Sequence, residues 1–206
     1  MSNQTHWESV YGTKSPESVS WYAPHLLQSL HYVRTAAPSK QASIIDVGGG
    51  ESTLVDDLLA DGYQDITVLD LSRTALEVTQ QRLGSKAADV AWLAADMLEM
   101  ELPAASVDVW HDRAVFHFLT TDEQRERYVA QVVHALRPGG FAIVGTFGPQ
   151  GPEKCSGLAV SRYAPDELHG KFGAPFELVD THTEIHTTPW GAPQQFVYCF
   201  CRHHAQ

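Results

Sequence analysis

Long apolar runs are absent from the sequence, and none approaches the ~20 residues that a helix needs to cross a bilayer. The N-terminus, Met1 to Glu8, is polar and lacks the basic and apolar segments of a secretory signal. Hydrophobic residues nevertheless make up 43% of the 206 positions and charged residues only 19%, which excludes a disordered chain. We therefore expect a cytoplasmic globular protein with no membrane partner.

Basic residues are also scarce. The 14 Lys and Arg residues are scattered along the chain and stand against 25 Asp and Glu residues, which gives a formal net charge of −11. Because an acidic surface repels a phosphate backbone, we expect no nucleic-acid partner.

Cysteine is scarcer still, with three residues at Cys155, Cys199 and Cys201. An odd number without CxxC spacing predicts neither a disulfide framework nor a zinc site, so we expect three reduced thiols. The histidines near the C-terminus, such as His182 and His186, also lack tight ligand spacing, and we expect no metal.

Short apolar runs alternate with amphipathic stretches over most of the chain. The apolar runs predict strands over residues 43–47, 66–69, 90–94, 107–110, 141–147, 176–186 and 195–202. The amphipathic stretches predict helices over residues 54–59, 73–83 and 122–136, with Ser72 as the N-cap of the second. Such alternation is typical of a parallel sheet with helices on both faces, and the last two strands should pair as an antiparallel hairpin.

The predicted fold class is therefore α/β, with a Rossmann-like, seven-stranded, mostly parallel sheet and a C-terminal antiparallel hairpin. The length is sufficient for one domain with a core of its own, spanning residues 1–206. We expect residues 1–40, which are rich in aromatic side chains, to form an N-terminal helical lid. Residues 41–147 should form the cofactor-binding core, and residues 148–206 a substrate-side loop, a helix and the hairpin.

Small and acidic residues follow three successive predicted strands. The segment Asp46–Ser52 carries Gly48, Gly49 and Gly50 where the first strand turns into a helix, and glycine lets the backbone turn tightly and approach a ligand. Asp70 ends the second strand, where an acid can accept hydrogen bonds from ribose hydroxyls. Asp96 follows the third strand, where a carboxylate can meet an adenine amino group. Ligands bind at this edge of such sheets, so the pattern predicts a nucleotide-like ligand.

Both NAD and S-adenosyl-L-methionine fit these residues. The third position of the glycine pattern is Ser52, whereas close binding of a pyrophosphate favours glycine there. S-adenosylmethionine has no phosphate, so its site tolerates a serine. The absence of a second substrate domain also favours the methyl donor.

Four segments together resemble the motifs of class I S-adenosylmethionine-dependent methyltransferases, namely Asp46–Gly50, Leu69–Ser72, Ala95–Asp96 and Leu136–Gly140. The resemblance covers residues 43–147, and Ser52 is its main departure. It implies that Asp46 and the glycines line the methionine part of S-adenosylmethionine. It further implies that Asp70 holds the ribose, that Leu71 lies against the adenine, and that Asp96 and Met97 bind the adenine edge. His111 would lie beside the sulfonium.

The segment Trp110–Phe118 holds two histidines, His111 and His117, at the same edge. Either can act as a general base, since histidine titrates near neutral pH, although both can equally be packing residues. A base is needed only when the acceptor must lose a proton early.

Residues around this edge are candidates for binding the methyl acceptor. Trp21 and Tyr22 belong to the aromatic N-terminal part and can shape a water-poor pocket with cation–π attraction for the sulfonium. Arg113 follows the fourth strand, while Arg162 and Tyr163 follow a loop rich in Pro and Gly, where an arginine can bind an acidic group.

Several functions remain compatible with these residues. A small-molecule acceptor is favoured, because the short acidic chain has no recognition domain for a large partner. A protein substrate methylated on lysine or another side chain is the alternative. An NAD-dependent oxidoreductase and a non-catalytic binding module are further alternatives, and the intact Asp46, Asp70 and Asp96 argue against the second of these.

Overall fold

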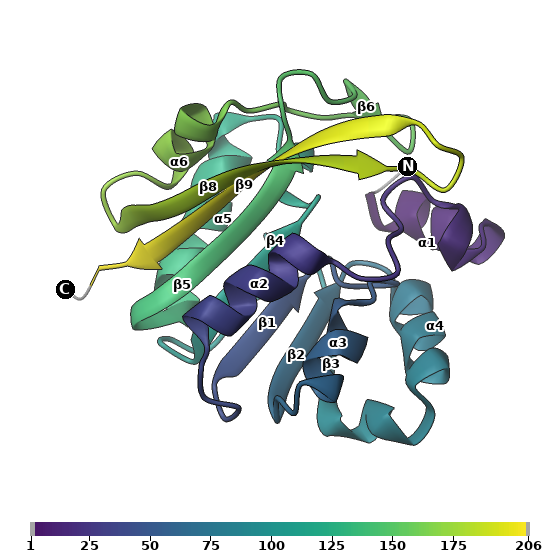
Figure 1. The fold of residues 1–206 in the computed structure, drawn as a ribbon, viewed down its shortest axis with the longest axis horizontal. Coiled ribbons are helices and arrows are strands. Elements are labelled where there is room, and N and C mark those ends of the chain that lie inside the picture. Colours follow the sequence, from purple (N-terminus) through teal and green to yellow (C-terminus); the bar gives the residue numbers. More distant parts are fainter. Residues whose placement is uncertain (1–2, 205–206) are drawn as a thin grey trace.

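A seven-stranded sheet organises the computed structural model, which describes residues 3–204 (Figure 1). The strand order is β3-β2-β1-β4-β5-β9-β8. The strands are β1 (Ser43–Val47), β2 (Asp65–Asp70), β3 (Val90–Ala94), β4 (Val107–Arg113), β5 (Leu136–Phe147), β8 (Phe176–Thr187) and β9 (Pro193–His203). The first five are parallel to one another, and β9 runs antiparallel to both β5 and β8. The predicted fold class is confirmed.

Helices cover both faces of the sheet, because side chains along each strand alternate between the faces. In β1, Ile44 packs with the helices α2 and α3, whereas Ile45 packs with α5 and α6. The helices are α1 (Asn3–Thr13), α2 (Leu27–Ala36), α3 (Leu54–Ala60), α4 (Arg73–Leu83), α5 (Asp122–Ala135) and α6 (Pro165–Phe172). The short 3-10 helices are η1 (Pro16–Ser18), η2 (Gly84–Asp89) and η3 (Phe116–Phe118). A small separate hairpin is formed by β6 (Lys154–Cys155) and β7 (Leu158–Ala159).

Two strands differ from their predicted bounds by three residues or more, β4 at its end and β5 at its beginning. The fourth strand was expected to end at Trp110, but β4 continues through His111, Asp112 and Arg113. These polar residues stay in the sheet because Asp46 and Val47 of β1 pair with His111 and Asp112. The fifth strand begins at Leu136, so the turn at residues 138–140 lies inside β5 rather than before it, with the ladder to β4 shifted there.

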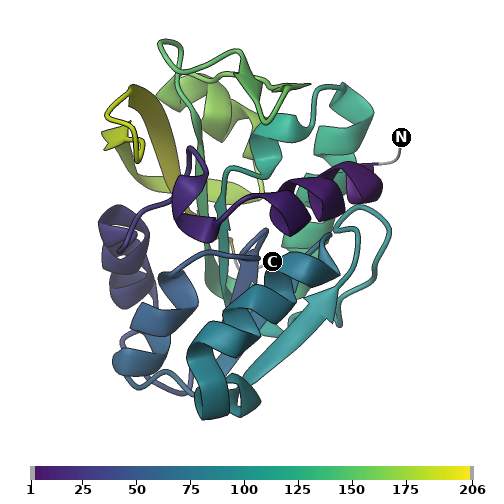
Figure 2. The same cartoon turned by 90° about the vertical axis from the view of Figure 1, so that its right-hand side faces the viewer.

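The N-terminal residues do not act as one lid. Helix α2 packs on β4 and β5 and thus covers a face of the sheet, as Figure 1 shows in front of β1, β4 and β5. Only α1 and the segment after it reach the carboxyl ends of the strands. Figure 2 shows α1, in purple, crossing this edge next to α4, which it contacts. Helix α1 thus lies where the lid was predicted and α2 does not, while the assignment of residues 1–40 as a lid stays a prediction.

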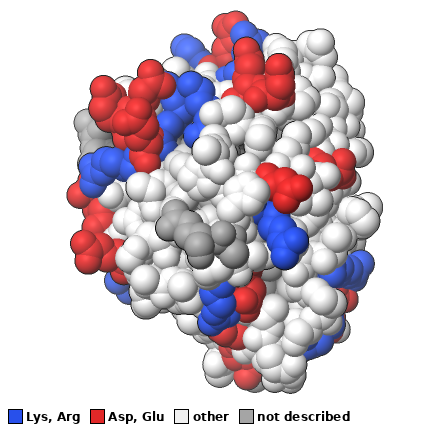
Figure 3. Space-filling model, turned by 90° about the vertical axis from the view of Figure 1, so that its left-hand side faces the viewer, with Lys and Arg blue, Asp and Glu red and all other residues white. Residues whose placement is uncertain are grey.

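Cys199 and Cys201 point to the same face of β9, and all three cysteines are free and buried. On the molecular face drawn in Figure 3, basic and acidic side chains lie interspersed among uncharged ones. None of the helices within residues 3–204 combines the length and the apolar character that a membrane crossing requires. In the same residues, no group of three or more His, Cys, Asp or Glu side chains is arranged to hold a metal ion.

Candidate active site

The topology places the site where the chain reverses its direction of winding. The chain builds the sheet outward from β1 to β3 and then returns to β4 on the other side of β1. In open parallel sheets, the crevice at such a switch point opens at the carboxyl ends of the strands and holds the ligand. Two neighbouring cavities lie there, which we call the main cavity and the second cavity. Gly48, Trp21 and Arg113 line both of them.

The glycine turn after β1 forms one wall of both cavities. Gly48 has φ +70°, and its N–H and that of Gly49 donate to the carbonyl of Leu69, at 2.7 and 3.3 Å. A Cβ on Gly48 would lie 2.0 Å from Cγ2 of Val115, so only glycine fits this position. Gly49 and Gly50 lie behind the turn, where a Cβ would meet the Asp46 and Asp70 carboxylates at 2.5 and 2.6 Å.

Asp70 is held in place at the end of β2. Its carboxylate accepts hydrogen bonds from the N–H groups of Gly50 and Ser72, at 3.0 and 2.8 Å. Burial raises the pKa of Asp70 to about 6, against the lowering effect of these two hydrogen bonds. Ser72 caps α4 as predicted, accepting from the N–H of Ala75. Asp70 is thus oriented toward the main cavity, which it lines together with Leu71.

The end of β3 supplies the far side of the main cavity. Asp96 and Met97 both line it, and Asp96 accepts the N–H of Leu98 at 2.9 Å, which shapes the turn. Met97 is buried at 6% exposure, whereas the Asp96 side chain is exposed. Asp70, Leu71, Asp96 and Met97 thus give the main cavity two carboxylates and two apolar side chains.

The end of β4 is fixed by the buried carboxylate of Asp112. It accepts hydrogen bonds from the N–H groups of Val115 and Phe116, at 2.9 and 3.0 Å, and from the hydroxyl of Tyr128. Burial raises the pKa of Asp112 to about 6, although these hydrogen bonds oppose the shift. The turn that it holds contains Ala114 at φ +75°, a left-handed conformation that is unusual for a residue with a side chain.

The second cavity contains buried polar atoms that have no hydrogen-bond partner in residues 3–204. These atoms are Oδ2 of Asp46, both carboxylate oxygens of Glu51, and Nη2 of Arg113. Burial raises the pKa of Glu51 to about 7, with nearby Arg82 lowering it and Asp70 raising it. Buried polar atoms are normally paired, so free atoms on one cation and two acids in one cavity indicate a ligand of complementary charge.

The two candidate bases differ in their surroundings, and neither has an imidazole nitrogen free in the main cavity. His111 is buried, with Nδ1 at 2.7 Å from Oδ1 of Asp46 and Nε2 at 2.8 Å from Oγ of Ser29. His117 is fully buried against Phe118 and Phe147, and burial with the charge of Arg113 lowers its pKa to about 3. His117 lines neither cavity, so proton transfer by either residue stays a prediction that this geometry disfavours.

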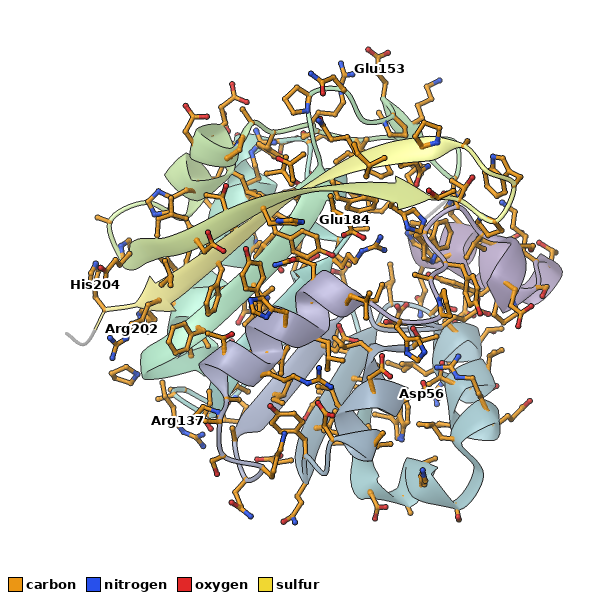
Figure 4. All side chains as sticks on the ribbon, viewed as in Figure 1. Asp56, Arg137, Glu153, Glu184, Arg202 and His204 are labelled. Carbon is orange, nitrogen blue, oxygen red and sulfur yellow. The ribbon has the colours of Figure 1, made fainter. Side chains whose placement is uncertain are left out.

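The expected acceptor-binding residues divide into two groups. Trp21 and Arg113 line both cavities, and Tyr22 lines the second. Arg162 instead serves its own loop, donating to the carbonyls of Pro149 and Gly151 and pairing with Glu153 at 3.0 Å. Glu153 points outward from this loop in Figure 4. Tyr163 is buried in the core against Phe116, so neither residue 162 nor 163 reaches a cavity.

Helix α1 closes the main cavity with aromatic rings. Trp7 packs against Tyr11, Trp21 and Phe118, with ring centroids 5.2–5.9 Å apart. The helix is fastened by Glu8, whose carboxylate accepts from the Ser72 hydroxyl and from the first N–H groups of α4. Sequence reasoning missed Glu8 and Glu51, because each depends on contacts that no local pattern signals.

Comparison with known proteins gives the chain's relationships. Residues 44–140 match the family model of a methyltransferase domain. The "eEF1A lysine and N-terminal methyltransferase" of Mus musculus is 26% identical over 218 residues, which cover 94% of this chain and 30% of that protein. A malonyl-(acyl-carrier protein) O-methyltransferase of Halalkalibacterium halodurans is 34% identical over 131 residues, covering 62% of this chain and 47% of that protein. The chain thus spans less than half the length of both relatives.

A solved structure shares the fold over nearly the whole chain. The N-methyltransferase NodS from Bradyrhizobium japonicum, in complex with S-adenosyl-L-homocysteine, has a TM-score of 0.73 and 15% sequence identity. The match covers 98% of this chain and 99% of that one. At this identity the likeness establishes the fold alone.

Proposed function

Because residues 44–140 match the model of a methyltransferase domain, we propose that this chain is a class I S-adenosylmethionine-dependent methyltransferase that binds S-adenosyl-L-methionine and methylates a small-molecule acceptor. One observation carries the proposal. The second cavity is lined by Asp46, Glu51 and Arg113, which leave Oδ2 of Asp46, both carboxylate oxygens of Glu51 and Nη2 of Arg113 without a partner in residues 3–204, and it adjoins the main cavity, which Asp70 and Asp96 line. An α-amino acid joined to a nucleoside has the complementary charges and shape.

The amino-acid end of the donor fits the second cavity. Its ammonium group would meet Asp46 and Glu51, and its carboxylate would meet Nη2 of Arg113. A dinucleotide fits less well, because its pyrophosphate would face two buried carboxylates. The residues present therefore suit S-adenosylmethionine better than NAD.

The nucleoside end of the donor fits the main cavity. We assign the ribose hydroxyls to Asp70, the apolar face of the adenine to Leu71 and Met97, and the adenine edge to Asp96. The backbone of Gly48 lies against the linkage between the two ends. These roles rest on the positions of the residues around the cavity.

The donor supplies an activated methyl group, so the protein's task is to position the acceptor and exclude water. Trp7, Tyr11, Trp21 and Phe118 form an aromatic wall on the side of the main cavity that faces α1. Aromatic faces attract a sulfonium and keep the reacting centre dry. Because the buried histidines offer no free base there, the acceptor we expect is a nucleophile that needs no proton removed by the protein.

Methylation of a protein is the second candidate function. Its support is the similarity to the mouse protein, whose name describes methylation of lysine and of an N-terminus. The small-molecule acceptor is favoured because the aromatic wall and the fastened helix α1 enclose the reaction centre. A peptide side chain would need that helix to move.

Calorimetry tests the donor assignment directly. S-adenosylhomocysteine should bind the purified chain with an affinity in the micromolar range or better, and NAD should not bind. Incubating the chain with methyl-labelled donor and cell extract then locates the acceptor, and we expect label in the small-molecule fraction. Binding of NAD without binding of S-adenosylhomocysteine would overturn the proposal, and label confined to protein would select the second candidate.

A further inference from the structure

A continuous chain of hydrogen bonds runs through the interior from β1 to the far end of β4. Oδ1 of Asp46 lies 2.7 Å from Nδ1 of His111, and Nε2 of His111 lies 2.8 Å from Oγ of Ser29. Ser29 then lies 3.3 Å from the hydroxyl of Tyr198, which accepts a hydrogen bond from Nε of Arg113 at 3.1 Å. The chain joins β1, β4, α2 and β9, whose residues are far apart in the sequence. We call it the buried relay.

Both ends of the buried relay carry an unpartnered atom in the second cavity. At one end, Asp46 uses Oδ1 for His111 and leaves Oδ2 without a partner. At the other, Arg113 uses Nε for Tyr198 and Nη1 for the carbonyl of Trp21, at 3.1 Å, and leaves Nη2 without a partner. The guanidinium carbon also lies over the Phe196 ring, 4.1 Å from its centroid.

One direction of donation satisfies every member of the relay. Arg113 donates to Tyr198, Tyr198 to Ser29 and Ser29 to Nε2 of His111, which leaves the proton on Nδ1 for Asp46. Ser29 is fully buried, and Tyr198, His111 and Asp46 are exposed by at most 2%. In such a dry interior these hydrogen bonds are strong, and each hydroxyl is both a donor and an acceptor that no apolar residue replaces.

We propose that Ser29 and Tyr198 are positioning residues that fix the spacing between Asp46 and Arg113, so that the pair recognises a zwitterionic α-amino-acid end. This inference rests on the proposed function, because that end would belong to S-adenosylmethionine. Neither residue lines a cavity, so both would act through their partners. Without the relay, Arg113 and Asp46 could approach each other or turn away, and the cavity would lose its charge pattern.

The relay also explains why His111 is held at both nitrogens. An imidazole that donates to Asp46 and accepts from Ser29 cannot serve as a proton acceptor for a substrate. His111 instead connects Ser29 on α2 to the Asp46 carboxylate on β1, so that the packing of α2 fixes where that carboxylate lies. The N-terminal helix α2 is thereby part of the donor site although it lies on a face of the sheet.

Two variants test the relay by removing one hydroxyl each, Tyr198→Phe and Ser29→Ala. Their affinities are measured by calorimetry for S-adenosylhomocysteine and for 5′-methylthioadenosine, which lacks the amino-acid end. We expect about tenfold weaker binding of S-adenosylhomocysteine in each variant, the size of one lost buried hydrogen bond, and unchanged binding of 5′-methylthioadenosine. A merely structural role would weaken both ligands alike.

Tyr63→Phe is the matched control, because Tyr63 is a buried tyrosine whose hydroxyl donates to the carbonyl of Ala37 at 2.8 Å, away from both cavities. It should leave both affinities unchanged. Suppose that the wild type binds both ligands. The relay is then refuted if the two variants keep the wild-type affinity for both ligands, or if their affinity for both falls equally, also where the cause is unfolding of the variant. If the wild type binds neither ligand, the proposed function itself has failed, and the inference fails with it.

Discussion

The proposed nucleoside side and the proposed acceptor side of the site are built in different ways. The nucleoside side, which we call the donor side, places Gly48, Asp70 and Asp96 at or within two residues of the ends of β1, β2 and β3. The acceptor side brings α1, η3 and the β6–β7 hairpin together from distant parts of the chain, at Trp7, Phe118 and Cys155. A local pattern therefore indicates the residues of the first, whereas tertiary packing assembles the second.

The two sides also differ in what their fit depends on. The donor side depends on the absence of side chains and on oriented carboxylates, as at Gly48 and Asp70. The acceptor side depends on large rings in mutual contact and on the Glu8 carboxylate that fastens α1 to α4. Substitutions should therefore affect donor affinity sharply on one side and turnover more gradually on the other.

The largest effect should come from Gly48→Ala. The new Cβ would lie 2.0 Å from Val115 in a left-handed backbone, so we expect donor affinity to fall by more than about 100-fold. Calorimetry with S-adenosylhomocysteine measures the change.

Gly62→Ala separates the effect of the left-handed backbone from the effect of the clash with Val115. Gly62 also has a positive φ, but nothing lies within 4 Å of its Cβ position. This variant should lower the free energy of unfolding by about 1–2 kcal/mol and leave donor affinity intact. Adding Val115→Ala to Gly48→Ala should recover part of the affinity. If Gly48→Ala binds the donor normally, the glycine turn does not shape the cavity.

The contrast between local patterns and long-range packing also explains which elements are predicted correctly from the sequence. The first strand was predicted at residues 43–47, and Ser72 was predicted as a cap, because both follow from local patterns, and both are confirmed. The fourth strand was predicted too short, because His111 to Arg113 are polar and only their pairing with β1 keeps them in the sheet. Long-range pairing of this kind leaves no periodic signal.

The site follows the same rule. The residues that the structure brings around the main cavity include Asp70, Asp96 and Gly48, which stand at predicted strand ends. Ser29 and Tyr198 lie 169 positions apart, and their contact arises only when α2 packs on the sheet that contains β9. Arg162 looked like an acceptor-binding residue, yet its charge is used to hold its own loop.

The next largest effect should be a pH dependence at Glu51, on the donor side. Burial raises the pKa of Glu51 from 4.5 to about 7, so the folded state favours the protonated form. The stability that protonated Glu51 contributes is fully present below pH 4.5 and is lost as the pH rises through about 7. Glu51→Gln should therefore become more stable than the wild type above pH 7, by at most about 3 kcal/mol, and match it near pH 4.

Chemical denaturation of both proteins across this pH range measures the difference. In the wild type, S-adenosylhomocysteine should also bind more tightly as the pH rises and Glu51 ionises, because the ammonium group of the ligand would then meet a carboxylate. A constant difference in stability between the two proteins at all pH values would contradict the assignment.

A smaller effect is expected on the acceptor side, from Trp7→Ala. The variant loses ring contacts with Tyr11, Trp21 and Phe118, each worth about 0.5–1.5 kcal/mol, so kcat/KM for the acceptor should fall about tenfold. Donor affinity should change far less. Trp190→Ala is the control, since Trp190 is 62% exposed and should alter neither quantity. An equal loss of donor affinity in Trp7→Ala would erase the distinction between the two sides.

The smallest effect should come from Glu8→Gln, and its pH dependence should have the opposite sign to that of Glu51. Burial opposes ionisation of Glu8, but the hydrogen bonds from Thr74, Arg73 and Ser72 outweigh it and lower its pKa. The ionised carboxylate therefore stabilises the fold at neutral pH, and this contribution is lost as the pH falls through the lowered pKa. Glu8→Gln should cost less than about 1 kcal/mol at pH 7 and still less at pH 3, because a charge at a helix N-terminus contributes only modestly and the carboxylate is progressively protonated as the pH falls. Denaturation at both pH values checks the sign. A variant whose stability matches the wild type at pH 7 would show that the aromatic rings alone hold α1 over the cavity.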